Sequence, residues 1–89
     1  MRSAIYEVRL LREVQGVLAK LETRVFFELA RDIDSLAFAP RREDAEELGD
    51  GFWLLRSGEF AIVYRIEDDR LVVVLIRVGT QAEILEESH

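Results

Sequence analysis

Apolar and polar side chains follow two different periods along this sequence, and the change of period divides it into elements. Three runs in the C-terminal half have the strand period of two: residues 52–57, 59–66 and 71–78. Ser57-Gly58 and Asp68-Asp69 separate them, and glycine and aspartate suit the short loops of hairpins. The pattern predicts a three-stranded antiparallel meander.

The helical period occupies the first half of the chain. Two apolar stripes with spacings near 3.6 residues predict two consecutive amphipathic helices. The first stripe consists of Val14, Val17, Leu18 and Leu21, and the second of Phe26, Leu29, Ala30, Ile33 and Leu36. Thr23 suits the N-cap of the second helix, and Pro40 requires that helix to end before it.

The remaining segments complete the predicted order. Residues 4–9 predict a first strand, the acidic residues 41–50 a solvated loop with at most one helical turn, and residues 80–89 an acidic tail with helical character around Ile84 and Leu85. The order is β-α-α-β-β-β. It indicates one α+β domain over residues 1–89, with a helical hairpin packed on one face of an antiparallel sheet.

The two faces of this sheet differ in what can cover them. Alternation places Phe60, Ile62, Tyr64 and Ile66 under the helices. In the last strand it separates one set, Val72, Val74, Ile76 and Val78, from the other, Leu71, Val73, Leu75 and Arg77. Because both sets are largely apolar, the open face also needs a cover. Either the C-terminal tail or another chain can supply it.

Composition narrows the classes of function. With 18 Asp and Glu against 12 Lys and Arg, the net charge is −6, opposite to the basic field of most nucleic-acid-binding proteins. No cysteine is present, so neither disulfides nor thiolate metal sites can form. No apolar run reaches the ~20 residues of a membrane span, and the first residues lack a secretory signal. We expect a cytoplasmic protein without cofactor or metal, in which the acids of residues 67–69 form a turn.

An ordered set of residues in the meander carries a family resemblance. It comprises Leu48-Gly49, then Trp53-x-Leu55-Arg56-x-Gly58-Glu59-Phe60, then Val63-Tyr64-Arg65-Ile66, and an apolar strand that ends at Val78-Gly79. With the preceding helical hairpin, the chain resembles the RelE/ParE superfamily of bacterial type II toxin–antitoxin toxins over nearly its whole length. The resemblance implies a toxin held inactive by a cognate antitoxin. One branch of the family cleaves mRNA in the ribosomal A site, and another poisons DNA gyrase.

The chain departs from the RNA-cleaving branch at the positions that perform chemistry. Cleavage needs a base for the 2′-OH, cations for the crowded phosphate and an acid for the leaving oxygen. The resemblance implies basic residues on the open sheet face and a tyrosine or histidine near the C-terminus. Those positions hold Phe52, Leu54, Ala61, Thr80-Gln81 and Ile84-Leu85. The basic approach loop is replaced by Glu43, Asp44, Glu46 and Glu47.

Three arginines remain as candidates for phosphate chemistry: Arg56, Arg65 and Arg77. Arginine binds phosphate but is a poor proton acceptor, because its pKa stays above about 12. Arg56 is more simply interpreted as the partner of a loop carboxylate. His89, the last residue, is poorly placed for catalysis. Tyr64 and Trp53 are interpreted as core and packing residues.

We therefore interpret the open sheet face as a surface for a protein partner. Its predicted residues are Phe52, Leu54, Arg56, Ala61, Val63, Arg65 and Gln81. The expected partner is a cognate antitoxin, and DNA gyrase, the ribosome or a second copy of the chain are further candidates. Two alternatives stay open: an mRNA endoribonuclease that uses Arg56, Arg65 and Arg77, and an inactive toxin relic with a binding or regulatory role. The sequence argues against an enzyme without excluding one.

Overall fold

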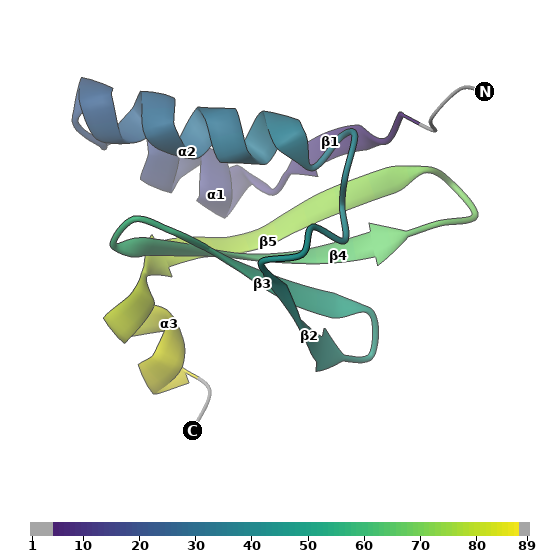
Figure 1. Cartoon of the computed structure of the whole chain (residues 1–89). Coiled ribbons are helices and arrows are strands. Elements are labelled where there is room, and N and C mark those ends of the chain that lie inside the picture. Colours follow the sequence, from purple (N-terminus) through teal and green to yellow (C-terminus); the bar gives the residue numbers. More distant parts are fainter. Residues whose placement is uncertain (1–4, 88–89) are drawn as a thin grey trace.

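A computed structural model describes residues 5–87, in which five strands and three helices follow one another along the chain (Figure 1). The elements are β1 (Glu7–Leu10), α1 (Arg12–Ala19), α2 (Thr23–Ser35), β2 (Ala45–Gly49), β3 (Phe52–Ser57), β4 (Phe60–Glu67), β5 (Val72–Thr80) and α3 (Gln81–Glu87). The predicted α+β class and helical hairpin are confirmed. Ala4, where the first strand was expected to begin, and His89 lie outside the described residues.

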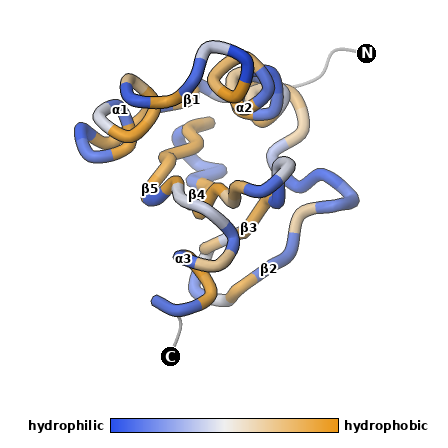
Figure 2. The backbone as a smooth tube through the Cα atoms, turned by 90° about the vertical axis from the view of Figure 1, so that its left-hand side faces the viewer, coloured by the Kyte–Doolittle hydropathy of each residue, from blue (hydrophilic) through white to orange (hydrophobic). Residues whose placement is uncertain are grey.

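The strands form one sheet in the order β1-β5-β4-β3-β2. β1 runs parallel to β5, and the other neighbours are antiparallel, as expected for a meander. Helices α1 and α2 cover one face of the sheet and α3 lies on the other (Figure 1). Viewed from the side, the apolar stretches of β3, β4 and β5 lie between these two helical layers (Figure 2).

The prediction of a loop over residues 41–50 is wrong, because this segment contains the edge strand β2. Ala45 pairs with Leu55 and Glu47 with Trp53. Asp50 and its two flanking glycines all have positive φ and form the turn into β3. An edge strand can carry exposed charges, which also discourage pairing with other chains. The acidic composition that indicated a loop is therefore compatible with a strand.

Two further predictions are corrected. Thr23 is the first residue of α2, and the N-cap is Glu22, whose side chain makes no capping hydrogen bond. The helical character expected around Ile84 and Leu85 is confirmed, because both lie in α3. In the β4–β5 turn, Leu71 rather than an aspartate has the positive φ.

A bulge in β5 overturns the strict alternation expected for that strand. Tyr64 lies opposite Leu75, but the preceding Val63 lies opposite Arg77, so one extra residue, Ile76, is inserted. Val78 consequently joins Leu75 in the core under the helices. The same shift places Arg77 beside Val63 on the open face. The bulge therefore adds a third arginine to that face.

The main core lies between the sheet and the α1–α2 layer. Its largest fully buried side chain is Tyr64, whose hydroxyl donates a 2.6 Å hydrogen bond to the carbonyl oxygen of Pro40. Burial raises the pKa of Tyr64 to about 12. Trp53 packs at the edge of this core, with the guanidinium of Arg41 5.8 Å from the ring centroid. Tyr64 thus ties the end of the helical hairpin to the sheet.

Candidate open-face site

Cross-strand pairs bring most of the predicted partner-binding residues to one face. Phe52 lies opposite Arg65, Leu54 opposite Val63, and Arg56 opposite Ala61, and directly opposed residues share a face of the sheet. We call this surface the open face; it is the face away from α1 and α2. Gln81 begins α3 at its border, where its side-chain amide donates a 2.7 Å hydrogen bond to the carbonyl of Gly58.

Helix α3 covers part of the open face. Ile84 is 5% exposed and packs in a small apolar cluster with Leu54, Ala61 and Val63. A reciprocal capping box begins the helix: the Thr80 amide donates to Glu83 Oε1 at 2.9 Å, and the Glu83 amide donates to Thr80 Oγ1 at 3.2 Å. The sequence left two candidates for covering the open face, the C-terminal tail and another chain. The tail covers part of it, but α3 has only seven residues.

The capping box also explains the glycine that ends the family motif. A Cβ built on Gly79 would approach Glu83 Oε1 to 3.0 Å, closer than most Cβ contacts. Glycine at this position lets the Glu83 carboxylate turn back toward the start of α3.

The three arginines of the open face have partners within the chain. Arg56 Nη1 lies 3.1 Å from Glu46 Oε1 on β2. Arg65 lies over the ring of Phe52, 5.4 Å from its centroid. Arg77 binds the Glu87 carboxylate on α3 through Nε at 3.0 Å and through Nη2.

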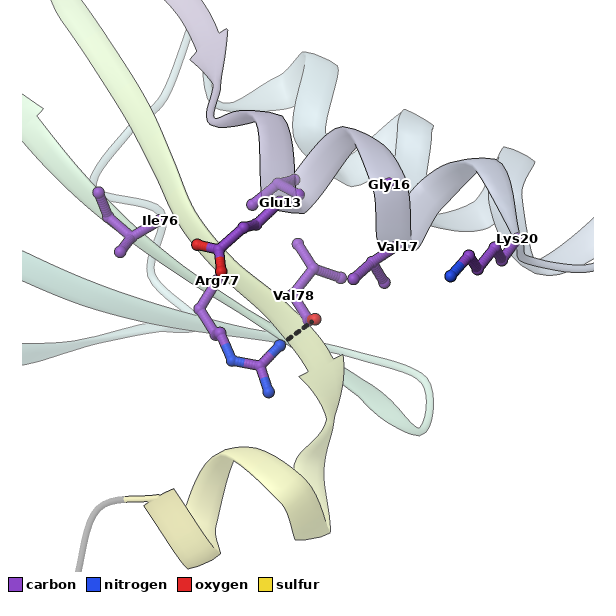
Figure 3. Close-up of a pocket in the computed structure, with 8 residues that line it drawn as sticks. Glu13, Gly16, Val17, Lys20, Ile76, Arg77 and Val78 are labelled. Carbon is purple, nitrogen blue, oxygen red and sulfur yellow. Dashed lines mark hydrogen bonds between the residues drawn. The ribbon is translucent and has the colours of Figure 1, made fainter.

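The Arg77 pair is the more firmly fixed of the two ion pairs. Its Nη1 also donates a 3.0 Å hydrogen bond to the carbonyl of Val78 (Figure 3). Together with the Glu87 contact, this bond holds the guanidinium at two points. Hydrogen bonding between the two groups raises the pKa of Arg77 and lowers the pKa of Glu87. Both groups therefore favour their charged forms.

A groove of about 480 Å³ runs between α3 and the strands of the open face. Leu54, Val63 and Ile84 contribute apolar surface to it, and the two arginine–glutamate pairs also line it. Leu48 and Leu85 line it too, although both are largely exposed. The groove thus combines an unfilled apolar surface with charges that are already paired.

A second cavity, of about 460 Å³, lies between α1 and β5 (Figure 3). Glu13 and Gly16 line it from α1, Lys20 from the C-cap of that helix, and Ile76 and Val78 from β5. Among the described residues, β1 pairs with β5 only as far as Leu75, so no strand covers the remaining edge of β5 here. The charges around this cavity are mixed and do not converge on one point.

Few groups near the open face could transfer a proton. Of the two tyrosines, Tyr64 is buried in the core, and Tyr6 donates a 2.7 Å hydrogen bond to Asp68 near the β4–β5 turn, which raises the pKa of its hydroxyl. His89 lies outside the described residues. Within residues 5–87, no three or more acidic or histidine side chains cluster as a metal site would require.

The predicted pairing of Arg56 with a loop carboxylate is confirmed, and the partner is Glu46. Sequence reasoning missed two roles: Glu87 pairs with Arg77, and Ile84 anchors α3. The isolated Ile84-Leu85 pair within an acidic tail was the available signal for an anchored helix. No local pattern marks Glu46 as the partner of Arg56, because that contact depends on the pairing of β2 with β3.

Comparison with known proteins shows which family this sequence matches. The sequence pattern described as "ParE toxin of type II toxin-antitoxin system, parDE" matches residues 5–85. No curated protein matches the chain by sequence. No helix in the described part of the chain is long and apolar enough to cross a membrane.

Solved structures agree with this match. A chain of the toxin–antitoxin complex RelBE2 from Mycobacterium tuberculosis is 27% identical, with a TM-score of 0.78 over 91% of this chain and 97% of that one. A free variant of the Escherichia coli toxin RelE is 24% identical, with a TM-score of 0.76 over 93% and 92%. The archaeal RelE–RelB complex from Pyrococcus horikoshii shows the same fold at 20% identity, with a TM-score of 0.75 over 86% and 96%.

Proposed function

We propose that this chain, which belongs to the ParE toxin family of type II toxin–antitoxin systems, binds a cognate antitoxin and acts through protein contacts rather than by cleaving RNA. The state of the open-face arginines carries the proposal. Arg56 and Arg77 are each held by a carboxylate of the same chain, and Arg65 lies over an aromatic ring. A phosphate would compete with Glu46 and Glu87 for Arg56 and Arg77, whose charges these carboxylates already balance.

The same face offers poor groups for proton transfer. An RNA-cleaving site needs a base whose pKa is matched to neutral pH. The pKa of Glu87 is lowered by Arg77, which makes this carboxylate a weak base, and the pKa of Tyr64 is about 12 in the core. Protein contacts require none of these groups.

The groove beside α3 suits an antitoxin segment. Two of the similar solved structures are complexes of toxins with antitoxins, which supports a cognate antitoxin for this chain. The apolar surface and exposed leucines of the groove favour an apolar segment. Because the chain carries a net charge of −6, we expect charged contacts to the antitoxin to involve its basic residues and to contribute less than the apolar ones.

Binding to the antitoxin encoded beside this chain's gene tests the proposal. We expect the double variant Leu48→Ser, Leu85→Ser to weaken binding about tenfold or more, which corresponds to about 1.4 kcal/mol. Phe38→Ser, at an exposed apolar position outside the groove, serves as a control and should bind as the wild type does. Affinity should change little between about 0.05 and 0.5 M NaCl. Loss of binding in high salt would contradict an apolar interface.

One observation favours a second candidate, an mRNA endoribonuclease. Arg56, Arg65 and Arg77 share the open face, and Arg65 has no carboxylate partner among the described residues. Cleavage of ribosome-bound mRNA by the wild type and by the Arg56→Ala, Arg65→Ala variant decides between the two. We expect neither to cleave. Efficient cleavage by the wild type that is lost in the variant would overturn the proposed function.

The cellular target is tested separately. Inhibition of DNA gyrase supercoiling by the purified chain, reversed by the antitoxin, would identify gyrase as that target. Normal growth after induction of the chain alone would instead identify a toxin relic that has kept only its partner.

A further inference from the structure

The side of α2 that faces away from the sheet carries two phenylalanines with two oppositely charged residues between them. In sequence order, these residues are Phe27, Arg31, Asp34 and Phe38. They recur every three or four residues, which is the spacing of one helical face. Although α2 ends at Ser35, the chain keeps turning beyond it, and the Ala39 amide donates a 2.9 Å hydrogen bond to the carbonyl of Ser35. Phe38 therefore stays near this face. We call the four residues the outer stripe of α2.

The two ends of the outer stripe are exposed aromatic side chains. Phe27 is 64% exposed and Phe38 63%. The buried residues of α2, Leu29 and Ile33, lie on the opposite side, toward the sheet. No other described element lies over the outer side of α2 (Figure 1). Exposed aromatic residues are frequent energetic centres of protein interfaces, so the outer stripe is suited to a protein partner.

The middle of the outer stripe carries one charge of each sign. Within residues 5–87, neither Arg31 nor Asp34 takes part in an ion pair. Asp32, which lies between them in the sequence, is already held in one. Arg24 and Glu28 lie beside the stripe and line a groove toward the β3–β4 turn. The outer stripe is therefore neutral, although the chain as a whole is acidic.

The order of these four residues is complementary to itself when the helix is reversed. In two antiparallel helices related by a twofold axis, residues at equal distances from the axis lie opposite one another. Phe27 and Phe38 have the same midpoint in the sequence as Arg31 and Asp34. An axis through this midpoint places an aromatic residue opposite an aromatic residue and an arginine opposite an aspartate. A partner of unrelated sequence would give no reason for this symmetry.

We propose that the outer stripe of α2 binds a second copy of this chain, with the two α2 helices antiparallel. Phe27 of each copy packs on Phe38 of the other, and Arg31 of each copy pairs with Asp34 of the other. Each contact thus occurs twice, as in other twofold dimers. One pair of helices buries little surface, and the net charge of −6 on each copy opposes association. We therefore expect a weak dimer, with a dissociation constant on the order of 10–100 µM.

This surface is separate from the groove used in the proposed function. Helix α2 covers one face of the sheet, and the groove with α3 lies on the other (Figure 1). Self-association of the chain is therefore measured without an antitoxin, and its outcome is independent of whether the open face binds one.

Sedimentation velocity of the full chain between about 5 and 500 µM tests the proposal, and the wild type should change from monomer to dimer over this range. Phe27→Ser and Phe38→Ser should each raise the dissociation constant about tenfold or more, because each removes two equivalent contacts. Leu85→Ser changes an exposed apolar residue on the other face of the sheet. This control should dimerise as the wild type does.

Charge reversals test the antiparallel arrangement. Arg31→Asp places aspartates opposite one another, and Asp34→Arg does the same with arginines, so each variant alone should dimerise about fivefold or more weakly. An equimolar mixture of the two variants should associate as tightly as the wild type, because every contact again joins an arginine to an aspartate. Arg12→Asp on α1 changes the net charge as Arg31→Asp does, and this control should stay near the wild type.

Every altered side chain is exposed, so the variants should keep melting temperatures close to the wild type, which separates lost association from lost folding. The proposal is overturned if the wild type stays monomeric up to about 500 µM, well above the expected dissociation constant. A dimer that persists unchanged in Phe27→Ser and Phe38→Ser would place the interface elsewhere and also overturn it. So would a mixture of the two charge variants that associates no better than either variant alone.

Discussion

The two faces of the sheet are covered in unequal ways. Beneath α1 and α2, the core contains fully buried Leu55, Ile62, Tyr64 and Leu75. Beneath α3, the buried cluster consists of Leu54, Ala61 and Ile84. The first face thus provides most of the burial that stabilises the fold, whereas the second keeps an open groove beside its helix. One face of the sheet thus stabilises the fold, and the other keeps a groove in which we propose that the antitoxin binds.

The covering helices differ in how they are held. α2 has 13 residues and buries Leu29 and Ile33, whereas α3 has seven residues and buries Ile84. A helix this short is marginal in water without tertiary contacts. We therefore expect α3 to depend on Ile84, on its capping box and on the Arg77–Glu87 pair. A partner that replaces these contacts could use the whole open face.

Substitutions of two neighbouring leucines test the difference in packing between the two faces, and they have the largest expected effect on stability. Leu55 is 0% exposed under the helices, and the adjacent Leu54 is 6% exposed under α3. Leu55→Ala should lower the free energy of unfolding by about 3 to 4 kcal/mol, since it leaves a cavity in a rigid core. Leu54→Ala should cost about 2 kcal/mol or less, because α3 can shift toward the gap. Urea denaturation measures both, and equal losses would show that the two faces are equally packed.

A smaller effect is expected from the anchor of α3. Ile84→Ala should release α3 while the rest of the fold remains, because the other contacts of this helix lie mostly at its ends. Amide exchange in α3 should accelerate about tenfold, with little change for amides in β4 and β5. Leu85→Ala, at an exposed position, is the matched control and should leave α3 protected. Uniformly faster exchange throughout the sheet would instead mean that α3 unfolds only with the whole domain.

The helix-covered face was largely predictable from sequence, because its signals are local. The helical stripes, the strand period and the turn at Ser57-Gly58 each follow from neighbouring residues. The predictions failed where the structure of a segment depends on its pairing with a strand that is distant in the sequence. β2 is an acidic segment that becomes a strand only beside β3, and the β5 bulge at Ile76 appears only in its register with β4.

For the open face, alternation predicted which residues of β3 and β4 lie together, but not which carboxylates pair with the arginines of that face. Alternation grouped Arg56 with Leu54, and strand pairing in the structure opposes them to Ala61 and Val63. The carboxylates that neutralise Arg56 and Arg77 come from segments that were expected to be a loop and a tail. Such contacts between elements have no local signature, so the chemistry of the face required the structure.

The smallest predicted effect concerns a charged contact outside the main core. Asp68 accepts hydrogen bonds from Arg41 Nη2 at 2.6 Å and from the Tyr6 hydroxyl at 2.7 Å, which tie the α2–β2 connection and the segment before β1 to the β4–β5 turn. These bonds lower the pKa of Asp68 to about 2 from its ordinary 3.8. Because the folded pKa is the lower one, the stabilisation is complete above pH ~4 and is lost as pH falls toward ~2.

Asp68→Asn should therefore lower the melting temperature slightly above pH ~4, and the difference from the wild type should vanish near pH ~2. The effect stays small because the Arg41 and Asp68 side chains are about half exposed and water screens the pair. The neighbouring Asp69→Asn, at a position without an ion pair among the described residues, is the control and should show no such trend. Thermal melts from pH 2 to 6 measure it. If the melting temperatures of the wild type and Asp68→Asn differ by the same amount at every pH in this range, the charge of Asp68 contributes nothing to stability.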